Sequence, residues 1–125
     1  MTSPDRKRVL FWWAVWLGYA AAWSVALLTR YPIKARDAVL PEDYHFIASK
    51  GLHVTAYALF AVLTSFLPIS VFWRRIVLLG VILHAPASEF FQQFVGRTPG
   101  LMDVGLDLAG ITLGVCVTWK RWRAS

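Results

Sequence analysis

One apolar segment, which reads KGLHVTAY, contains three side chains that could bind a ligand or take part in a reaction: Lys50, His53 and Tyr57. Their spacing of three and four residues places all three on one face of a helix. A histidine titrates near neutral pH and can move a proton, while a lysine ammonium offers three donors to an anionic group. The pattern is typical of a site that binds a phosphate or carboxylate, or that carries out acid-base chemistry.

Acidic and amide side chains follow in two later apolar segments. Glu89 precedes Gln92 by three residues, Asp103 precedes Asp107 by four, and Arg97 lies in the turn VGRTPG between them. A rise of about 1.5 Å per residue places these groups and His53 within roughly 10 Å of one membrane boundary. Ionisable residues inside a membrane avoid lipid and pair with one another, so we expect these side chains to face a common interior.

The elements that must position these residues are membrane helices. Hydrophobic residues make up 58% of the 125 positions and charged residues only 16%, where about a quarter is usual in soluble domains. A membrane-spanning helix needs about 20 mostly apolar residues. We predict an all-α, polytopic membrane four-helix bundle in a single domain, 1–125, with helices at about 9–28, 50–67, 76–94 and 101–119 and an external loop over 29–49.

The distribution of basic residues predicts the orientation. Three lie at the N-terminus, two between the second and third helices and three at the C-terminus, against five in the other two loops. The positive-inside rule therefore places both termini in the cytoplasm. Tryptophans gather at the same boundaries, as an aromatic belt would: Trp12, Trp13, Trp73, Trp119 and Trp122. Because the basic clusters flank apolar segments, we predict contact with membrane lipids and no nucleic-acid partner.

Several other kinds of site lack their sequence signatures. The chain has no HExxH or CxxC pattern, so we predict no metal and no cofactor. Ser88 precedes Glu89 without the GxSxG context of a serine nucleophile. His84 is better explained as a core histidine than as a ligand. The Gly110-xxx-Gly114 stripe predicts close helix packing.

The segments KGLHVTAYAL (50–59) and EFFQQFVGRTPGLMDVGLDLAGITLG (89–114) together resemble the VanZ-like family of small membrane proteins. The family pattern is D-K-x-x-H-x-x-x-Y, then E-x-x-Q, an Arg, and D-x-x-x-N-x-x-G-x-x-x-G. Nine positions match it: Lys50, His53, Tyr57, Glu89, Gln92, Arg97, Asp103, Gly110 and Gly114. Ser49 replaces the family's Asp and Asp107 its Asn, which we interpret as a relocated charge.

The resemblance implies a cell-envelope protein of the bacterial cytoplasmic membrane, in a family named for resistance to the glycopeptide antibiotic teicoplanin. We expect a ligand site in the outer leaflet for a lipid headgroup, a lipid-linked envelope precursor or a lipoglycopeptide. Its residues would be Lys50, His53, Tyr57, Glu89, Gln92, Arg97, Asp103 and Asp107.

Three alternatives stay open. In the first, the same polar residues only hold the helices together. In the second, the protein is an enzyme that performs acid-base chemistry on an envelope lipid headgroup, with His53, Glu89 and Asp103 as catalytic candidates. The third is a proton or ion path along the polar layer, which the absence of ionisable residues from 61–67 and 111–118 disfavours.

Overall fold

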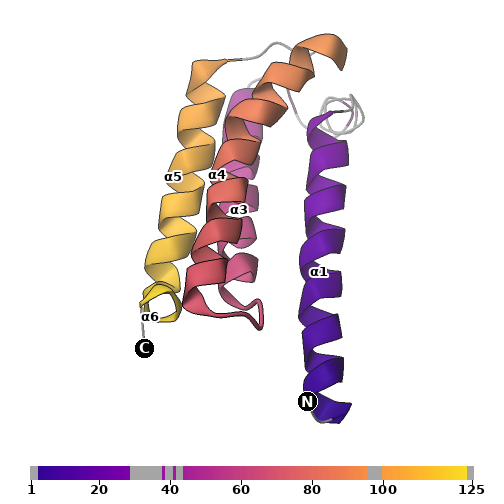
Figure 1. Cartoon of the computed structure of the whole chain (residues 1–125). Coiled ribbons are helices and arrows are strands. Elements are labelled where there is room, and N and C mark those ends of the chain that lie inside the picture. The colour runs from indigo at the N-terminus through magenta and orange to yellow at the C-terminus, as the bar shows by residue number, and fades with distance from the viewer. Residues whose placement is uncertain (1–2, 29–37, 39–40, 42–43, 96–99, 124–125) are drawn as a thin grey trace.

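The computed structural model describes residues 3–28, 38, 41, 44–95 and 100–123, and these form helices and no strand (Figure 1). The all-α prediction is confirmed for this part of the chain. The elements are α1 (Ser3–Leu27), α3 (His45–Ser65), α4 (Val71–Gln92), the short 3-10 helix η2 (Gln93–Val95), α5 (Leu101–Val117) and α6 (Trp119–Trp122).

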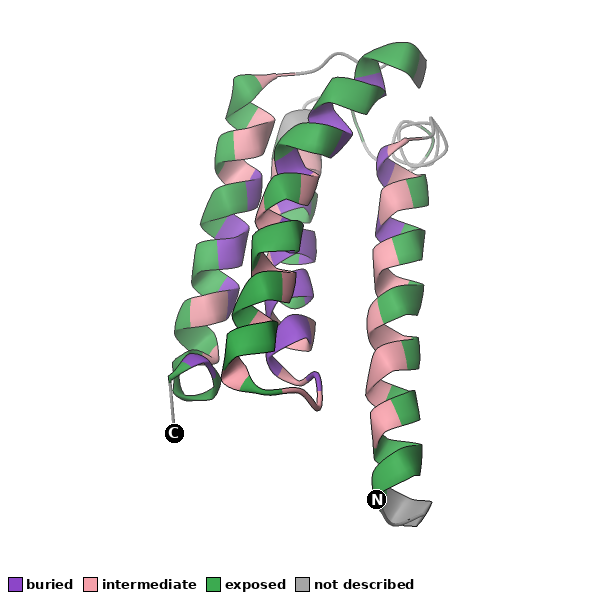
Figure 2. Cartoon of the chain, viewed as in Figure 1, coloured by how far each residue is buried: buried purple, intermediate pink, exposed green. Residues whose placement is uncertain are grey.

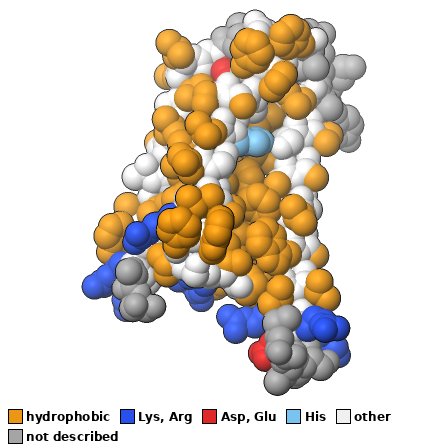
Figure 3. Space-filling model, viewed as in Figure 1, with side chains coloured by type: hydrophobic (Ala, Val, Ile, Leu, Met, Phe, Trp, Pro, Cys, Tyr) orange, Lys and Arg blue, Asp and Glu red, His pale blue; other side chains and the backbone are white. Residues whose placement is uncertain are grey.

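Three of these helices are long and apolar enough to cross a membrane, over Asp5–Leu27, Ile47–Ser65 and Val71–Gln92. Their outward faces carry large exposed hydrophobic side chains such as Leu17, Leu59 and Leu79. Figure 3 shows such side chains covering the middle of the molecule, with lysines and arginines gathered at one end. These features indicate a membrane protein. α5 is shorter, with 17 residues.

α5 packs closely against α3 because glycines let the two backbones approach. A Cβ atom on Gly110 would overlap the carbonyl oxygen of Val54, and one on Gly114 would overlap that of Ala58. α4 lies beside both helices, and α1 stands further out, leaning on α3 and α4 (Figure 1). The glycine stripe therefore has the packing role that the sequence predicts.

The buried apolar core lies where α1, α3 and α4 converge, with one contribution from α5. In Figure 2 the buried residues line the inward faces of the helices and the exposed ones face outward. The members of this cluster are Trp23, Leu27, Ala56, Tyr57, Phe60, Ala61, Val81, Ala85 and Ile111.

Three predicted helix starts are too late. The first helix begins at Ser3 instead of 9, α3 at His45 instead of 50, and α4 at Val71 instead of 76. Residues 45–49 therefore belong to α3 and not to the predicted external loop, most of which lies outside the described residues. Hydropathy misses the polar start of α1, SPDRKR, whereas α4 already begins with Val71, Phe72 and Trp73, ahead of the Arg74–Arg75 pair after which the helix is predicted. At α4 the helix starts where the hydroxyl of Ser70 accepts the backbone N–H of Trp73 at 3.5 Å.

The predicted helix ends are close to those observed. The sequence predicts ends at 28, 67, 94 and 119, and the helices end at Leu27, Ser65, Gln92 and Val117. The short 3-10 helix η2 continues from α4, as often happens at a helix C-terminus.

Candidate functional site

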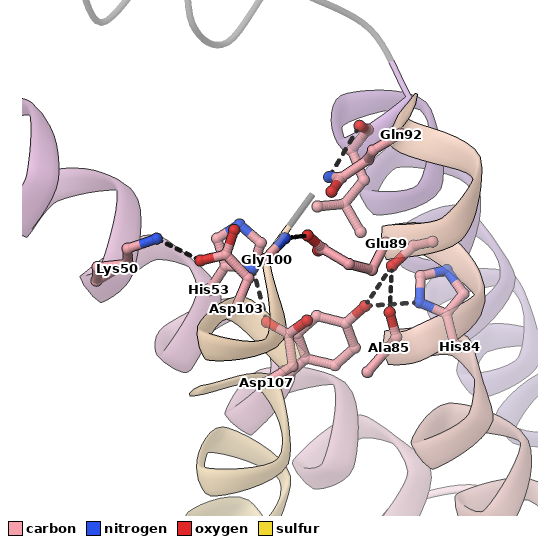
Figure 4. Close-up of polar contacts among 12 residues, drawn as sticks. Lys50, His53, His84, Ala85, Glu89, Gln92, Gly100, Asp103 and Asp107 are labelled. Atoms are coloured by element: carbon pink, nitrogen blue, oxygen red, sulfur yellow. Dashed lines mark hydrogen bonds and ion pairs between the residues drawn. The ribbon is translucent and has the colours of Figure 1, made fainter. Parts of the chain in front are cut away.

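A polar cluster occupies the region where the start of α3, the end of α4 and the start of α5 meet, away from both termini (Figures 1 and 4). We define the polar cluster by eight side chains: Lys50, His53, Tyr57, His84, Ser88, Glu89, Asp103 and Asp107. They come from three helices, and the α3–α5 approach at Gly110 and Gly114 brings the basic residues of α3 to the acids of α5.

Lys50 and Asp103 form an ion pair between α3 and α5, through Nζ and Oδ1. Their side chains are 24% and 16% exposed, so this pair is partly accessible. Asp103 lies in the first turn of α5, where the positive end of the helix dipole also favours a carboxylate. The ammonium group of Lys50 carries three hydrogen-bond donors and no acceptor.

His53 and Asp107 form a second pair about one turn deeper. His53 Nδ1 lies 2.6 Å from Asp107 Oδ1, and the two side chains are only 4% and 1% exposed. Asp107 Oδ2 is buried and has no hydrogen-bond partner among the described residues. The edge-on ring of Trp23, with centroids 5.8 Å apart, packs against the imidazole. The carboxylate therefore fixes the orientation of His53 and leaves Nε2 outside this bond.

A chain of hydrogen bonds runs from α1 through α4 to α3 at the next level. Ser24 Oγ lies 2.9 Å from His84 Nε2, and His84 Nδ1 lies 2.8 Å from the Tyr57 hydroxyl. The Tyr57 hydroxyl is 3.3 Å from Ser88 Oγ, which donates to the carbonyl of Ala85 at 2.9 Å. One assignment satisfies every contact: Ser24 donates to Nε2, Nδ1–H donates to Tyr57, and Tyr57 donates to Ser88. Both nitrogens of His84 are thus engaged, and its side chain is partly buried.

Glu89 and Gln92 connect α4 to its neighbours through backbone groups. Glu89 is buried, and its Oε1 accepts a hydrogen bond from the backbone N–H of Gly100, the residue before α5. Gln92 Nε2 donates to the carbonyl of Leu27 at 3.1 Å, at the C-terminal end of α1. Glu89 thereby positions the start of α5, and Gln92 satisfies a carbonyl that a helix end leaves without an intrahelical partner.

Six of the eight predicted ligand residues come together in the polar cluster: Lys50, His53, Tyr57, Glu89, Asp103 and Asp107. Gln92 points toward α1 instead, and Arg97 lies outside the described residues. The sequence prediction did not include the other two members, His84 and Ser88, or Ser24, whose hydroxyl contacts His84. Ser88 follows His84 by four residues, which puts both on one face of α4, but nothing in the spacing relates Ser24 to them.

Metal binding gains no support within the described ranges, where no three His, Cys, Asp or Glu residues gather as a metal site would require. The arrangement instead offers two basic groups, each held by a carboxylate, at two depths. It is suited to binding an anionic group at Lys50 or to proton transfer at His53.

No family model matches this chain, and no curated protein or solved structure does so either. The resemblance to the VanZ-like family stays a prediction that depends on the motif spacing described above.

Proposed function

We propose that this chain is a VanZ-like, multi-pass cell-envelope protein of the bacterial cytoplasmic membrane. In this proposal α1, α3, α4 and α5 form a four-helix membrane bundle with both termini in the cytoplasm. The polar cluster then lies in the outer leaflet and binds the anionic headgroup of an envelope lipid or of a lipoglycopeptide such as teicoplanin.

One observation supports the binding role most strongly, which is the graded exposure of the two ion pairs. The Lys50–Asp103 pair is partly exposed, whereas His53 and Asp107 are almost fully buried. An incoming phosphate can replace Asp103 as the partner of Lys50, because lysine binds phosphate as a point charge. The deeper pair then keeps α3 and α5 in register while the outer pair exchanges partners.

The orientation is supported by the charge distribution. Figure 3 shows lysines and arginines at the end of the molecule that carries the termini. Arg74 and Arg75 lie at the start of α4, Lys120 and Arg121 lie in α6, and Arg123 directly follows α6. The positive-inside rule places this end in the cytoplasm, so the polar cluster is on the outer side.

A binding measurement separates this role from a purely structural one. The full-length protein, purified in detergent, is titrated with a short-chain polyprenyl phosphate and, separately, with teicoplanin. We expect Lys50→Gln to weaken binding of the phosphate about tenfold or more, since it removes a charge-assisted contact. Asp103→Asn should preserve or strengthen binding, because it removes the anion that competes for Lys50. Lys7→Gln, a matched loss of one charge at the other end, should leave affinity within about twofold.

The result that would reject the binding role is equally specific. If Lys50→Gln and Asp103→Asn both lower thermal stability and neither alters affinity, the polar cluster only joins helices. A parallel susceptibility assay in a teicoplanin-sensitive host, with membrane abundance matched, tests the antibiotic link separately. Protection by the wild type that Lys50→Gln abolishes would support that link.

The enzymatic alternative has one observation in its favour, the 2.6 Å contact between His53 and Asp107. A carboxylate that orients a histidine is the usual support for a general base. If the protein turns over an envelope lipid, His53→Gln should abolish turnover and leave headgroup binding in place. Turnover that persists in His53→Gln would exclude His53 as the acid-base residue.

A further inference from the structure

A second candidate binding region lies at the opposite end of the molecule from the polar cluster. An open groove of about 660 Å³ is formed by the last turns of α3 and α5 together with α6. This volume is within the usual range for ligand pockets, about 300 to 1,000 Å³. At a rise of about 1.5 Å per residue, Thr118 in the groove lies roughly 16 Å from Asp107 along the axis of α5. It is therefore independent of the function proposed above.

The groove has an apolar wall and a cationic rim. Val62 of α3, Phe66 directly after α3, and Val117 of α5 supply the apolar part. The cationic rim, as we name it, consists of Lys120, Arg121 and Arg123. Such an arrangement offers an amphiphile both a place for its charge and a place for its hydrocarbon.

The cationic rim is held in place by α4. Arg74 Nη1 donates to the carbonyl of Arg121 at 3.2 Å, and Arg75 Nη2 donates to that of Trp122 at 2.7 Å. The guanidinium of Arg121 also lies over the ring of Phe66, 3.8 Å from its centroid, as a cation–π contact. Because both arginines of α4 bind backbone carbonyls, α6 stays anchored when side chains of the rim are changed.

Positive charge accumulates at this end without matching acids. Arg74 is subject to electrostatic repulsion from both Arg121 and Arg8. Of the acids in the described residues, Asp5 alone belongs to a segment at this end, since Glu89, Asp103 and Asp107 belong to the polar cluster. A phosphate anion in the groove would relieve this repulsion, and arginine and lysine are the side chains that suit it.

The apolar surface continues from the groove along the outside of α5. Leu113 and Val117, spaced i, i+4, are 53% and 74% exposed, and Trp119 beside the rim is 57% exposed. A free inorganic anion would gain nothing from contact with this apolar surface, whereas an acyl chain would bury it. We propose that the groove binds one anionic phospholipid, with its phosphate at the cationic rim and an acyl chain along Leu113 and Val117.

Native mass spectrometry of the full-length protein in detergent tests this proposal, with dioleoyl phosphatidylglycerol titrated against dioleoyl phosphatidylcholine. Each lysine or arginine near anionic lipid contributes about fivefold to affinity. We expect the triple variant Lys120→Gln/Arg121→Gln/Arg123→Gln to lose at least about tenfold in phosphatidylglycerol affinity and its preference over phosphatidylcholine. The matched triple variant Arg6→Gln/Lys7→Gln/Arg8→Gln should lose less than about threefold.

Two further variants cover the remaining outcomes. The single variant Lys120→Gln, an exposed position, should lose about fivefold and retain the wild-type melting temperature, so a folding defect in the triple variant leaves the test intact. Val117→Asn should weaken binding of phosphatidylglycerol, because it places a polar side chain on the surface that the acyl chain would cover. Equal losses in the two triple variants would show diffuse attraction to positive charge and overturn the proposal. So would displacement of the lipid by millimolar inorganic phosphate, which would indicate an anion site with no role for the acyl chain.

Discussion

α5 and α1 are attached to the rest of the molecule in two different ways. α5 meets α3 backbone to backbone at Gly110 and Gly114, and two ion pairs join the same helices. α1 makes its contacts through side chains: the Trp16 indole donates to Thr64 at 2.9 Å, and Tyr19 donates to the carbonyl of Ala56. We refer to these contacts as the α5 seam and the α1 seam.

The two seams differ because they bring together different kinds of groups. Asp103 and Asp107 can reach Lys50 and His53 only if α5 is very close to α3, because a carboxylate on a short side chain has little reach. The α1 seam holds aromatic rings between helices, for example Trp16 and Phe60 with centroids 5.6 Å apart. Rings can shift and repack, but a carbonyl oxygen of α3 cannot move aside for a new methyl group. The α5 seam should therefore be the less tolerant of the two.

The largest effect should come from adding one methyl group to the α5 seam. We expect Gly110→Ala to lower the free energy of unfolding by about 3 kcal/mol, because the new Cβ overlaps the backbone of Val54. Equilibrium unfolding in mixed detergent micelles measures this. Gly105→Ala is the matched control on the same helix, where a Cβ meets nothing within 4 Å, and it should stabilise by up to about 1 kcal/mol. Equal stabilities of the two variants would mean that the seam is looser than described.

Removing the deep acid should have the next largest effect. Asp107→Ala leaves His53 without its buried partner, and we expect a loss of about 2 kcal/mol in the free energy of unfolding. Asp107→Asn keeps an acceptor oxygen and should cost less. A double-mutant cycle with His53→Leu should give a coupling energy above about 0.5 kcal/mol. Purely additive losses would show that the pair does not join α3 to α5.

A smaller loss is expected in the α1 seam when Ser24 is replaced. Ser24→Ala removes one of the two hydrogen bonds to His84 while Tyr57 keeps the other. The expected cost is about 1 kcal/mol in the same unfolding assay. His84→Leu removes both bonds and should cost more. A Ser24→Ala variant that costs as much as His84→Leu would contradict the independent contribution of Tyr57.

The smallest effect should follow from removing one hydroxyl of the α1 seam. Tyr19→Phe deletes the bond to the Ala56 carbonyl, which lies inside α3 and is also an acceptor of the helix itself. We expect a loss of about 0.5 kcal/mol or less, as for most interhelical hydrogen bonds in membranes. A loss that rivals Gly110→Ala would reverse the ranking of the two seams.

The α5 seam was the more predictable of the two from sequence. The i, i+4 acids and the glycine stripe share one face of a single helix, so the pattern itself indicates that they meet one partner. The expectation that ionisable residues pair inside the bundle is met by Lys50 with Asp103 and by His53 with Asp107. Glu89 does not follow this pattern. The expected partner is a charged side chain, but its carboxylate accepts the backbone N–H of Gly100 instead. A backbone partner of this kind cannot be found from the spacing of side chains.

Most contacts of the α1 seam could not be predicted from the sequence. Ser24 and His84 are separated by 60 positions, and each looks like an isolated polar residue in an apolar helix. Their contact depends on how α1 is rotated about its axis, and the apolar residues on every side of α1 leave that rotation unspecified. Hydropathy indicates the apolar part of each long helix, but it misses the polar first turns of α1.

The α5 seam also imposes an order on biosynthesis. Lys50 precedes Asp103 by 53 residues in the chain, and His53 precedes Asp107 by 54. At about 5 to 20 residues per second, α3 leaves the ribosome roughly 3 to 10 s before the acids that neutralise it. Lys50 and His53 are therefore synthesised well before Asp103 and Asp107, and the two ion pairs between α3 and α5 can form only after α5 has been made.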